Sequence, residues 1–148
     1  MKDLIYQLDQ KFIDLLGIIS MPLARFAIFV VYFWFGILKV LGTSPANPLV
    51  NDLLQKTLPF LTFEQFIVYF GVFEMAIGIL FLFPKLDRIS SLILASHMVT
   101  TAMPLILLPA ATWQSFLVPT LEGQYIIKNI LIVALVFGLG ARLKPLKD

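Results

Sequence analysis

Four ionisable side chains lie inside long apolar segments of this sequence, and they are the residues most able to do chemistry. They are Lys39, Glu74, His97 and Lys128. Each costs several kcal/mol where it faces hydrocarbon, so we expect each to face a protein interior or a water-filled cavity. A carboxyl or an imidazole in such a place can bind a ligand or handle a proton.

Each of these side chains has a structural and a functional interpretation. Glu74 either forms an ion pair with Lys128 or Lys39 that holds helices together, or it handles protons. His97 either forms a buried hydrogen bond, for example with Thr101 or Glu74, or relays protons and donates a hydrogen bond to a quinone carbonyl. The two lysines either extend to the nearer membrane surface or draw an anion into an outer vestibule.

Aromatic side chains in the same segments are candidates for a flat ring site. Tyr32, Trp34 and Phe73 can line such a site together with His97 if their faces converge. A quinone is the cofactor that this combination of rings and an imidazole would suit. Tyr32 and Thr101 complete the set of predicted binding or proton-handling residues.

Metal and covalent chemistry are not indicated. Zero cysteines exclude disulfides and thiolate-held clusters, and a single histidine excludes bis-histidine haem ligation within one chain. One histidine and one glutamate make an incomplete ligand set, so no metal site is predicted. The sequence has no nucleophile–base set, phosphate loop or cofactor motif. No catalytic residue is therefore predicted, and a non-catalytic membrane subunit is expected rather than an enzyme.

The composition indicates what kind of elements position these residues. The 148 residues are 59% hydrophobic and 14% charged, against about 45–50% and about 25% in soluble domains. This departure predicts a polytopic membrane protein of one domain, without a large extramembrane catalytic domain. The net charge of +2 gives no reason to expect nucleic acid as a partner.

Residues 1–22 predict an amphipathic helix that lies in the membrane interface. Acidic residues interrupt the apolar stretch, so the segment does not resemble a secretory signal. At helical spacing one face is apolar and the opposite face is polar. The apolar face consists of Leu4, Leu8, Phe12, Leu15 and Ile19, and the polar face of Asp3, Gln7, Gln10 and Asp14. Pro22 is expected to turn the chain into the membrane.

Residues 23–143 predict an all-α, four-span membrane bundle. The predicted spans are about 23–41, 63–83, 89–108 and 124–143, and a polar tail follows at 144–148. Each span has about the 20 residues that a helix needs to cross a bilayer. The prolines of the loop at 42–61 leave room for a short helix over 49–56. The loop at 110–123 contains Pro119.

Local signals mark where two of these spans begin. Thr62 followed by Gln65 resembles a capping box, so the second span is expected to begin there. Pro84 ends that span, and Asp87 is the expected cap of the third.

Basic residues predict the orientation. Most of them gather at the termini and in the connection between the second and third spans, whereas the other side has only Lys56. The residues of the first group are Lys2, Lys11, Arg25, Lys85, Arg88, Arg142, Lys144 and Lys147. Positive residues stay in the cytoplasm during insertion, which predicts both termini inside a bacterial inner (plasma) membrane.

Helical spacing places small and polar residues on shared faces. Three such stripes are Gly71, Glu74 and Gly78; Ser90, His97, Thr101 and Pro104; and Tyr32, Gly36 and Lys39. The small residues predict close approach between helices. We expect Lys39 and Lys128 at the outer mouth of the bundle, with Glu74 and His97 at its floor.

Four stretches of the chain resemble one known family. They are FWFGILKVLG, SPANPLV, GVFEMAIGILFLFP and EGQYIIKNILIV. Their order and spacing over most of residues 25–143 are similar to the DoxX-like superfamily, and within it to the YkgB-type branch. The matching positions are Gly36, Lys39, Glu74, Gly78 and Lys128. The chain departs from the branch at Asn129, where an acidic residue is usual.

The resemblance implies a four-helix membrane bundle associated with membrane redox complexes, including quinone-reducing thiosulfate oxidation, and with resistance to oxidants. One hypothesis is therefore a small membrane subunit or accessory of a redox or oxidant-stress system that binds a quinone or an oxidoreductase partner subunit. An alternative is a homo-oligomeric transporter or channel for a small anion or weak acid. A third is a structural assembly factor. In each case the lipid bilayer is a partner.

Overall fold

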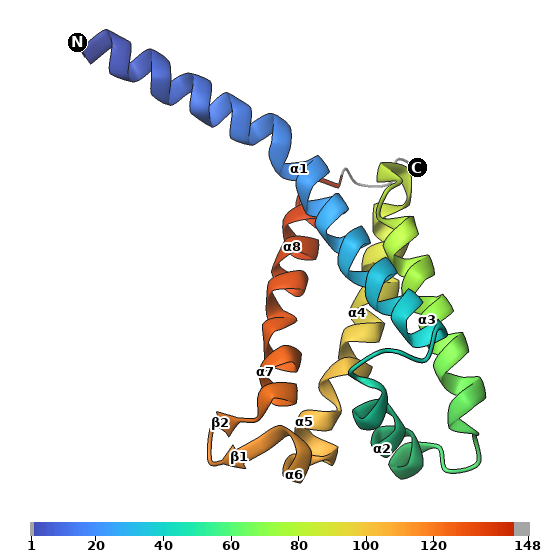
Figure 1. Cartoon of the computed structure of the whole chain (residues 1–148). Helices are drawn as coiled ribbons and strands as arrows, with labels where there is room; N and C mark the ends of the chain where they lie inside the picture. Colours follow the sequence, from blue (N-terminus) through green and yellow to red (C-terminus); the bar gives the residue numbers. More distant parts are fainter. Residues whose placement is uncertain (1, 144–148) are drawn as a thin grey trace.

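The computed structural model describes residues 2–143 and shows a mostly helical chain (Figure 1). Its elements are α1 (Lys2–Val40), α2 (Asn47–Thr57), α3 (Phe63–Leu80), η1 (Pro84–Leu86), α4 (Asp87–Ala102), α5 (Pro104–Leu107), α6 (Pro109–Thr112), β1 (Trp113–Ser115), β2 (Val118–Pro119), α7 (Leu121–Lys128) and α8 (Ile130–Gly140). The polar tail predicted at 144–148 lies outside the described residues.

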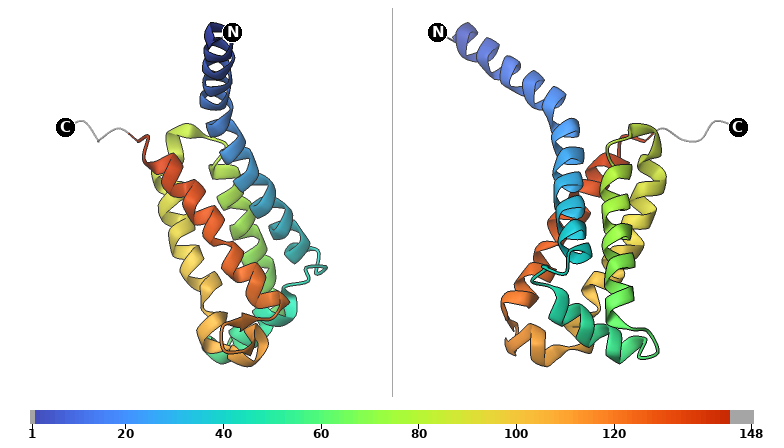
Figure 2. Two further views of the ribbon diagram at one scale, coloured as in Figure 1. Left: turned by 90° about the vertical axis from the view of Figure 1, so that its left-hand side faces the viewer. Right: turned by 45° about the vertical axis from the view of Figure 1, so that its right-hand side comes forward.

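Four helical stretches are long and apolar enough to cross a membrane, as the sequence predicts. They are Lys2–Val40, Phe63–Leu80, Pro84–Leu107 and Leu121–Gly140. Successive stretches run in opposite directions, and α1, α3, α4 and α8 pack in that order around a common interior (Figure 2). α1 and α3 form the most extensive pair.

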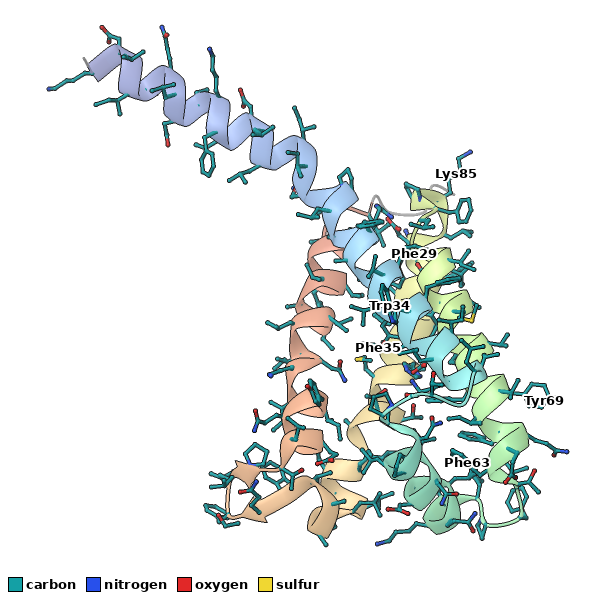
Figure 3. All side chains as sticks on the ribbon, viewed as in Figure 1. Phe29, Trp34, Phe35, Phe63, Tyr69 and Lys85 are labelled. Atoms are coloured by element: carbon teal, nitrogen blue, oxygen red, sulfur yellow. The ribbon has the colours of Figure 1, made fainter. Side chains whose placement is uncertain are left out.

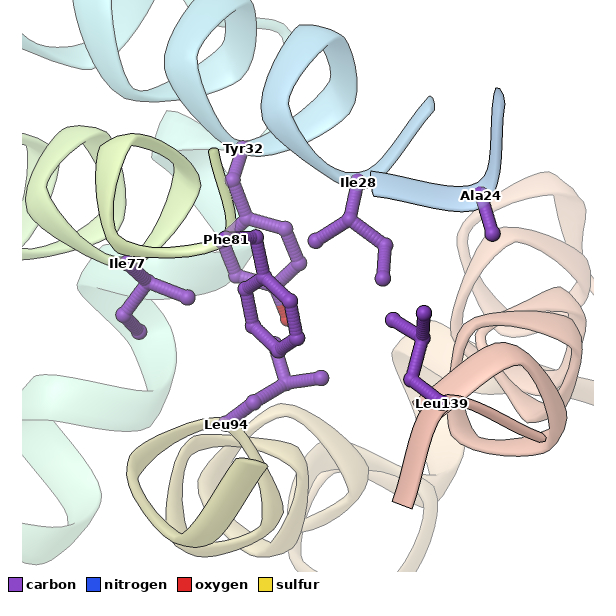
Figure 4. Packing of buried hydrophobic residues seen from close by; sticks show 7 residues of the cluster. All are labelled: Ala24, Ile28, Tyr32, Ile77, Phe81, Leu94 and Leu139. Carbon is purple, nitrogen blue, oxygen red and sulfur yellow. The ribbon is translucent and has the colours of Figure 1, made fainter. Parts of the chain in front are cut away.

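The buried core is small and lies between these four stretches. It consists of Ala24, Ile28, Tyr32, Ile77, Phe81, Leu94 and Leu139 (Figure 4). Many large apolar side chains instead lie on the outer faces, for example Val99, Ile106 and Ile130. A soluble protein buries most such residues, so this distribution fits a bundle with an apolar surrounding.

α1 is one continuous helix through Pro22, whereas the sequence predicts that an interfacial helix ends at that residue and the first span begins after it. Proline removes one backbone hydrogen bond and bends a helix, but it does not have to end it. The bend directs the N-terminal half of α1 away from the bundle (Figures 1 and 2). Residues 2–20 are all exposed, and their side chains project freely (Figure 3).

The starts of α3 and α4 differ from the predicted caps. Thr62 is the N-cap residue of α3, but its side chain makes no capping hydrogen bond, so the predicted capping box does not form. The N-cap of α4 is Leu86 rather than Asp87. The carboxylate of Asp87 is engaged by Arg25 of α1, which is a stronger partner than a backbone N–H.

The predicted loop at 110–123 contains α6 and a two-stranded antiparallel hairpin, so the fold is not strictly all-α. Two side chains donate to backbone carbonyls in this region, and one of them replaces a backbone donor that a proline lacks. Pro109 cannot donate to the carbonyl of Leu105, and the indole Nε1 of Trp113 donates to it at 2.9 Å. The ammonium of Lys56 on α2 donates to the carbonyl of Leu107 at 2.6 Å. α2 itself confirms the short helix predicted over 49–56.

Candidate functional site

Glycines bring α1 and α3 into backbone contact at the site. A Cβ atom at Gly36 would lie 2.6 Å from the carbonyl oxygen of Gly71 and 2.7 Å from Cγ of Met75. A Cβ atom at Gly78 would lie 3.0 Å from the backbone nitrogen of Phe33. The close approach predicted from the small residues is therefore confirmed, and it decides which side chains of the two helices can meet.

Lys39, Glu74 and His97 form one buried charge cluster at this contact. Nζ of Lys39 donates to Oε2 of Glu74 at 2.6 Å. Nε2 of His97 lies 3.4 Å from the other carboxylate oxygen, Oε1. The side chains are 7%, 10% and 3% exposed, respectively. Both oxygens of one carboxylate thus face a nitrogen, one on α1 and one on α4.

Thr101 lies beside His97 on α4, as the helical stripe predicts. Its hydroxyl donates to the backbone carbonyl of His97 at 3.0 Å and lies 3.4 Å from Nε2. Nε2 therefore has both the carboxylate of Glu74 and this hydroxyl within reach. A carboxylate beside Nε2 favours the tautomer that carries the proton on that nitrogen.

Aromatic rings surround the imidazole of His97. Its ring centroid lies 5.5 Å from that of Tyr32, 5.3 Å from that of Phe70 and 5.8 Å from that of Phe73. Trp34 was expected in this group but is 61% exposed and belongs to the outer face of α1. Phe70 takes that place, and its spacing of four residues before Glu74 is the sequence signal that could have identified it.

Tyr32 contributes a second polar group near the cluster. Its hydroxyl contacts Sδ of Met98 at 4.0 Å, and sulfur is a weak acceptor. The O–H can therefore turn to a stronger acceptor at little cost.

Lys128 lies outside the cluster, contrary to the expected arrangement. It is exposed, and its Nζ lies 5.3 Å from the ring centroid of Tyr125. Tyr125 lies one helical turn earlier on the same exposed face of α7, so the phase of this helix turns both side chains outward. The predicted mouth formed by Lys39 and Lys128 is wrong, because Lys39 pairs with Glu74.

The structure also contains an ion pair that was not predicted from the sequence. Arg25 of α1 and Asp87 of α4 form a two-pronged pair, with Nη2 2.5 Å from Oδ2 and Nη1 bonded to Oδ1. The two side chains are largely buried. This pair joins α1 to α4 at the end opposite the hairpin, so two buried ion pairs tie α1 to its neighbours.

The cluster offers groups for binding and for proton exchange. His97 and Tyr32 can each donate a hydrogen bond, and the rings of Phe70 and Phe73 supply apolar surface beside them. Glu74 can accept a proton, while Lys39 supplies a positive charge beside it. Within residues 2–143, no group of three or more histidine, cysteine, aspartate or glutamate side chains could hold a metal ion.

Fold and site together define a mostly helical protein with four potential membrane-crossing helices and a buried Lys–Glu–His cluster. Comparison of the chain with protein families, curated proteins and solved structures finds no match.

Proposed function

We propose that this chain is an integral membrane four-helix bundle with both termini in the cytoplasm of a bacterial cell. Four long apolar stretches and outward-facing apolar side chains support the membrane location. Lys85, Arg88 and Arg142 lie at one end of the bundle, which supports the orientation. The exposed amphipathic half of α1 leaves the bundle at that same end (Figure 1), where it can lie along the interface.

A single-cysteine reporter tests this orientation cleanly, because the chain has no cysteine of its own. Ser115 on β1 and Lys85 on η1 are both exposed, and they lie at opposite ends of the bundle. We expect Ser115→Cys to react with an impermeant maleimide in intact spheroplasts. Lys85→Cys, the matched control, is expected to react only after the membrane is opened. The reverse pattern would contradict the orientation.

We further propose a role as a membrane subunit or accessory of a redox or oxidant-stress system, of DoxX-like, YkgB-type character, whose buried cluster binds a quinone headgroup. The observation that carries this proposal is the meeting of two polar groups, the imidazole of His97 and the hydroxyl of Tyr32, with the rings of Phe70 and Phe73. A quinone has a flat ring and two carbonyl acceptors. One carbonyl can accept from the hydroxyl of Tyr32, and the other from Nε2–H of His97 in place of Glu74. Glu74 beside His97 can exchange the proton that such a ligand takes up or releases.

Native mass spectrometry of the protein, extracted gently from its own membrane, tests this role. We expect a retained quinone or an oxidoreductase partner subunit. His97→Leu is expected to lower the retained quinone about tenfold, since one hydrogen bond is worth about 1.4 kcal/mol. Lys128→Met is the control, because Lys128 lies outside the cluster, and it should retain as much quinone as the wild type.

A homo-oligomer that retains neither a quinone nor a partner would contradict the redox role. Flux measurements in liposomes would then test the transporter for a small anion or weak acid. The geometry gives that alternative less support, because Lys39 is held by Glu74 and Lys128 points outward.

A further inference from the structure

A groove lies between α4 and α8, and two of its lining residues, Leu94 and Met98, also contact the buried core. It has a volume of about 440 Å³, within the range of about 300–1,000 Å³ typical of small-molecule sites. Its lining is almost entirely apolar and includes Ala95, Met98, Val136, Phe137 and Gly140. The bundle therefore has an apolar groove between two of its four membrane-crossing stretches.

The groove suits a chain narrower than a helix. From Ser91 to Met98 its wall on α4 is about 10 Å long. A helix is about 10 Å in diameter, so only one of its faces could enter a groove of this size, whereas a hydrocarbon chain is narrow enough to lie within it. A single hydrocarbon chain is the thinner occupant that a bilayer supplies.

One polar atom of the lining has no partner. Oγ of Ser91 is buried and makes no hydrogen bond, whereas the hydroxyls of Ser90 and Ser96 on the same helix donate to backbone carbonyls one turn earlier. Ser91 lies about 6 Å from the start of α4, close to one membrane surface. An unpaired hydroxyl in an apolar site is costly unless a ligand bonds it.

Basic residues lie at the end of the groove nearest Ser91. Arg88 is three residues before Ser91, so it shares the face of α4 that lines the groove. Arg142 directly follows Ala141, the last lining residue beyond α8. Both arginines are exposed. Guanidinium groups bind phosphate through paired N–H donors, so this end is complementary to an anionic headgroup.

We propose that the α4–α8 groove binds one acyl chain of an anionic phospholipid of the cytoplasmic leaflet, with the phosphate at Arg88 and Arg142 and an ester oxygen at Ser91. The inference rests on the membrane location proposed above and not on the quinone role. It assigns a site to a part of the bundle that the charge cluster does not use.

Native mass spectrometry of the detergent-solubilised full chain tests the site with two lipids of identical acyl chains. We expect phosphatidylglycerol to be retained at least tenfold more than phosphatidylcholine. Replacing both arginines, Arg88→Gln with Arg142→Gln, is expected to weaken binding of phosphatidylglycerol about thirtyfold, since each basic residue near the surface contributes about fivefold. Lys85→Gln, at the same end but outside the groove, should leave retention unchanged.

A second variant tests the binding of the acyl chain separately from the binding of the headgroup. Ala95→Phe places a large ring in the groove and is expected to lower the retention of both lipids, while circular dichroism checks that the helices are intact. The proposal would be overturned if phosphatidylglycerol and phosphatidylcholine were retained equally and if Ala95→Phe lowered the retention of neither. The proposal would also be overturned if the protein formed a dimer without bound lipid and if Ala95→Phe dissociated that dimer. A second copy of the chain would then occupy the groove. A chain found in the soluble fraction would instead refute the membrane location itself.

Discussion

Replacing Glu74 by glutamine is expected to destabilise the protein by about 3–5 kcal/mol, because it leaves a buried ammonium without its carboxylate. Lys39 is only 7% exposed on its side chain, and its Nζ lies 2.6 Å from Oε2 of Glu74. The lysine cannot regain full hydration while α1 stays packed against α3. Equilibrium unfolding in mixed detergent micelles, followed by circular dichroism, measures the loss.

The double substitution Glu74→Gln with Lys39→Met is expected to recover most of this stability, because it removes both charges from the interior. The matched control is Glu74→Gln with Lys128→Met, which should recover nothing, since Lys128 is exposed beside Tyr125. Recovery with Lys128→Met instead of Lys39→Met would contradict the pairing.

The same double variant distinguishes a scaffold from a functional site. If Glu74→Gln with Lys39→Met folds and still retains its quinone or partner, the ion pair serves only to hold α1 and α3 together. If it folds but retains neither, the charges have a role in the proposed function. The folding measurement and the retention measurement must therefore be made on the same variant.

Adding a single methyl group at Gly36 is expected to destabilise the bundle by about 3 kcal/mol, the upper end of the cost of overpacking. The new Cβ atom in Gly36→Ala would lie 2.6 Å from the carbonyl oxygen of Gly71, and a backbone atom cannot swing aside as a flexible side chain can. The two helices must separate, which also draws Lys39 away from Glu74. The same unfolding measurement in micelles gives the magnitude.

Gly138→Ala is the matched control for this change. Gly138 lies within α8, and a Cβ atom there would have nothing within 4 Å. Alanine is favoured over glycine inside a helix by about 0.5–1 kcal/mol, so this variant should be slightly stabilised. Equal effects at Gly36 and Gly138 would show that the α1–α3 contact is looser than described.

Helical spacing predicted correctly much of what surrounds the site. The stripe of Gly71, Glu74 and Gly78 faces α1, and Thr101 lies beside His97. Such predictions succeed because the faces of a straight helix depend only on its period of about 3.6 residues. The expectation that Lys128 lines the outer mouth rests instead on the cost of a charge in hydrocarbon. It is wrong because that cost does not tell which face of a helix turns toward the other helices.

The sequence by itself determined the class of elements: four helices long and apolar enough to cross a membrane, with ionisable residues inside them. Composition and periodicity suffice for this, because they are local properties of the chain. Only the tertiary structure decided that Lys39 rather than Lys128 pairs with Glu74, that Phe70 rather than Trp34 faces His97, and that Asp87 pairs with Arg25. These choices depend on how neighbouring helices are rotated and how closely they approach, and that geometry arises from packing between residues far apart in the chain.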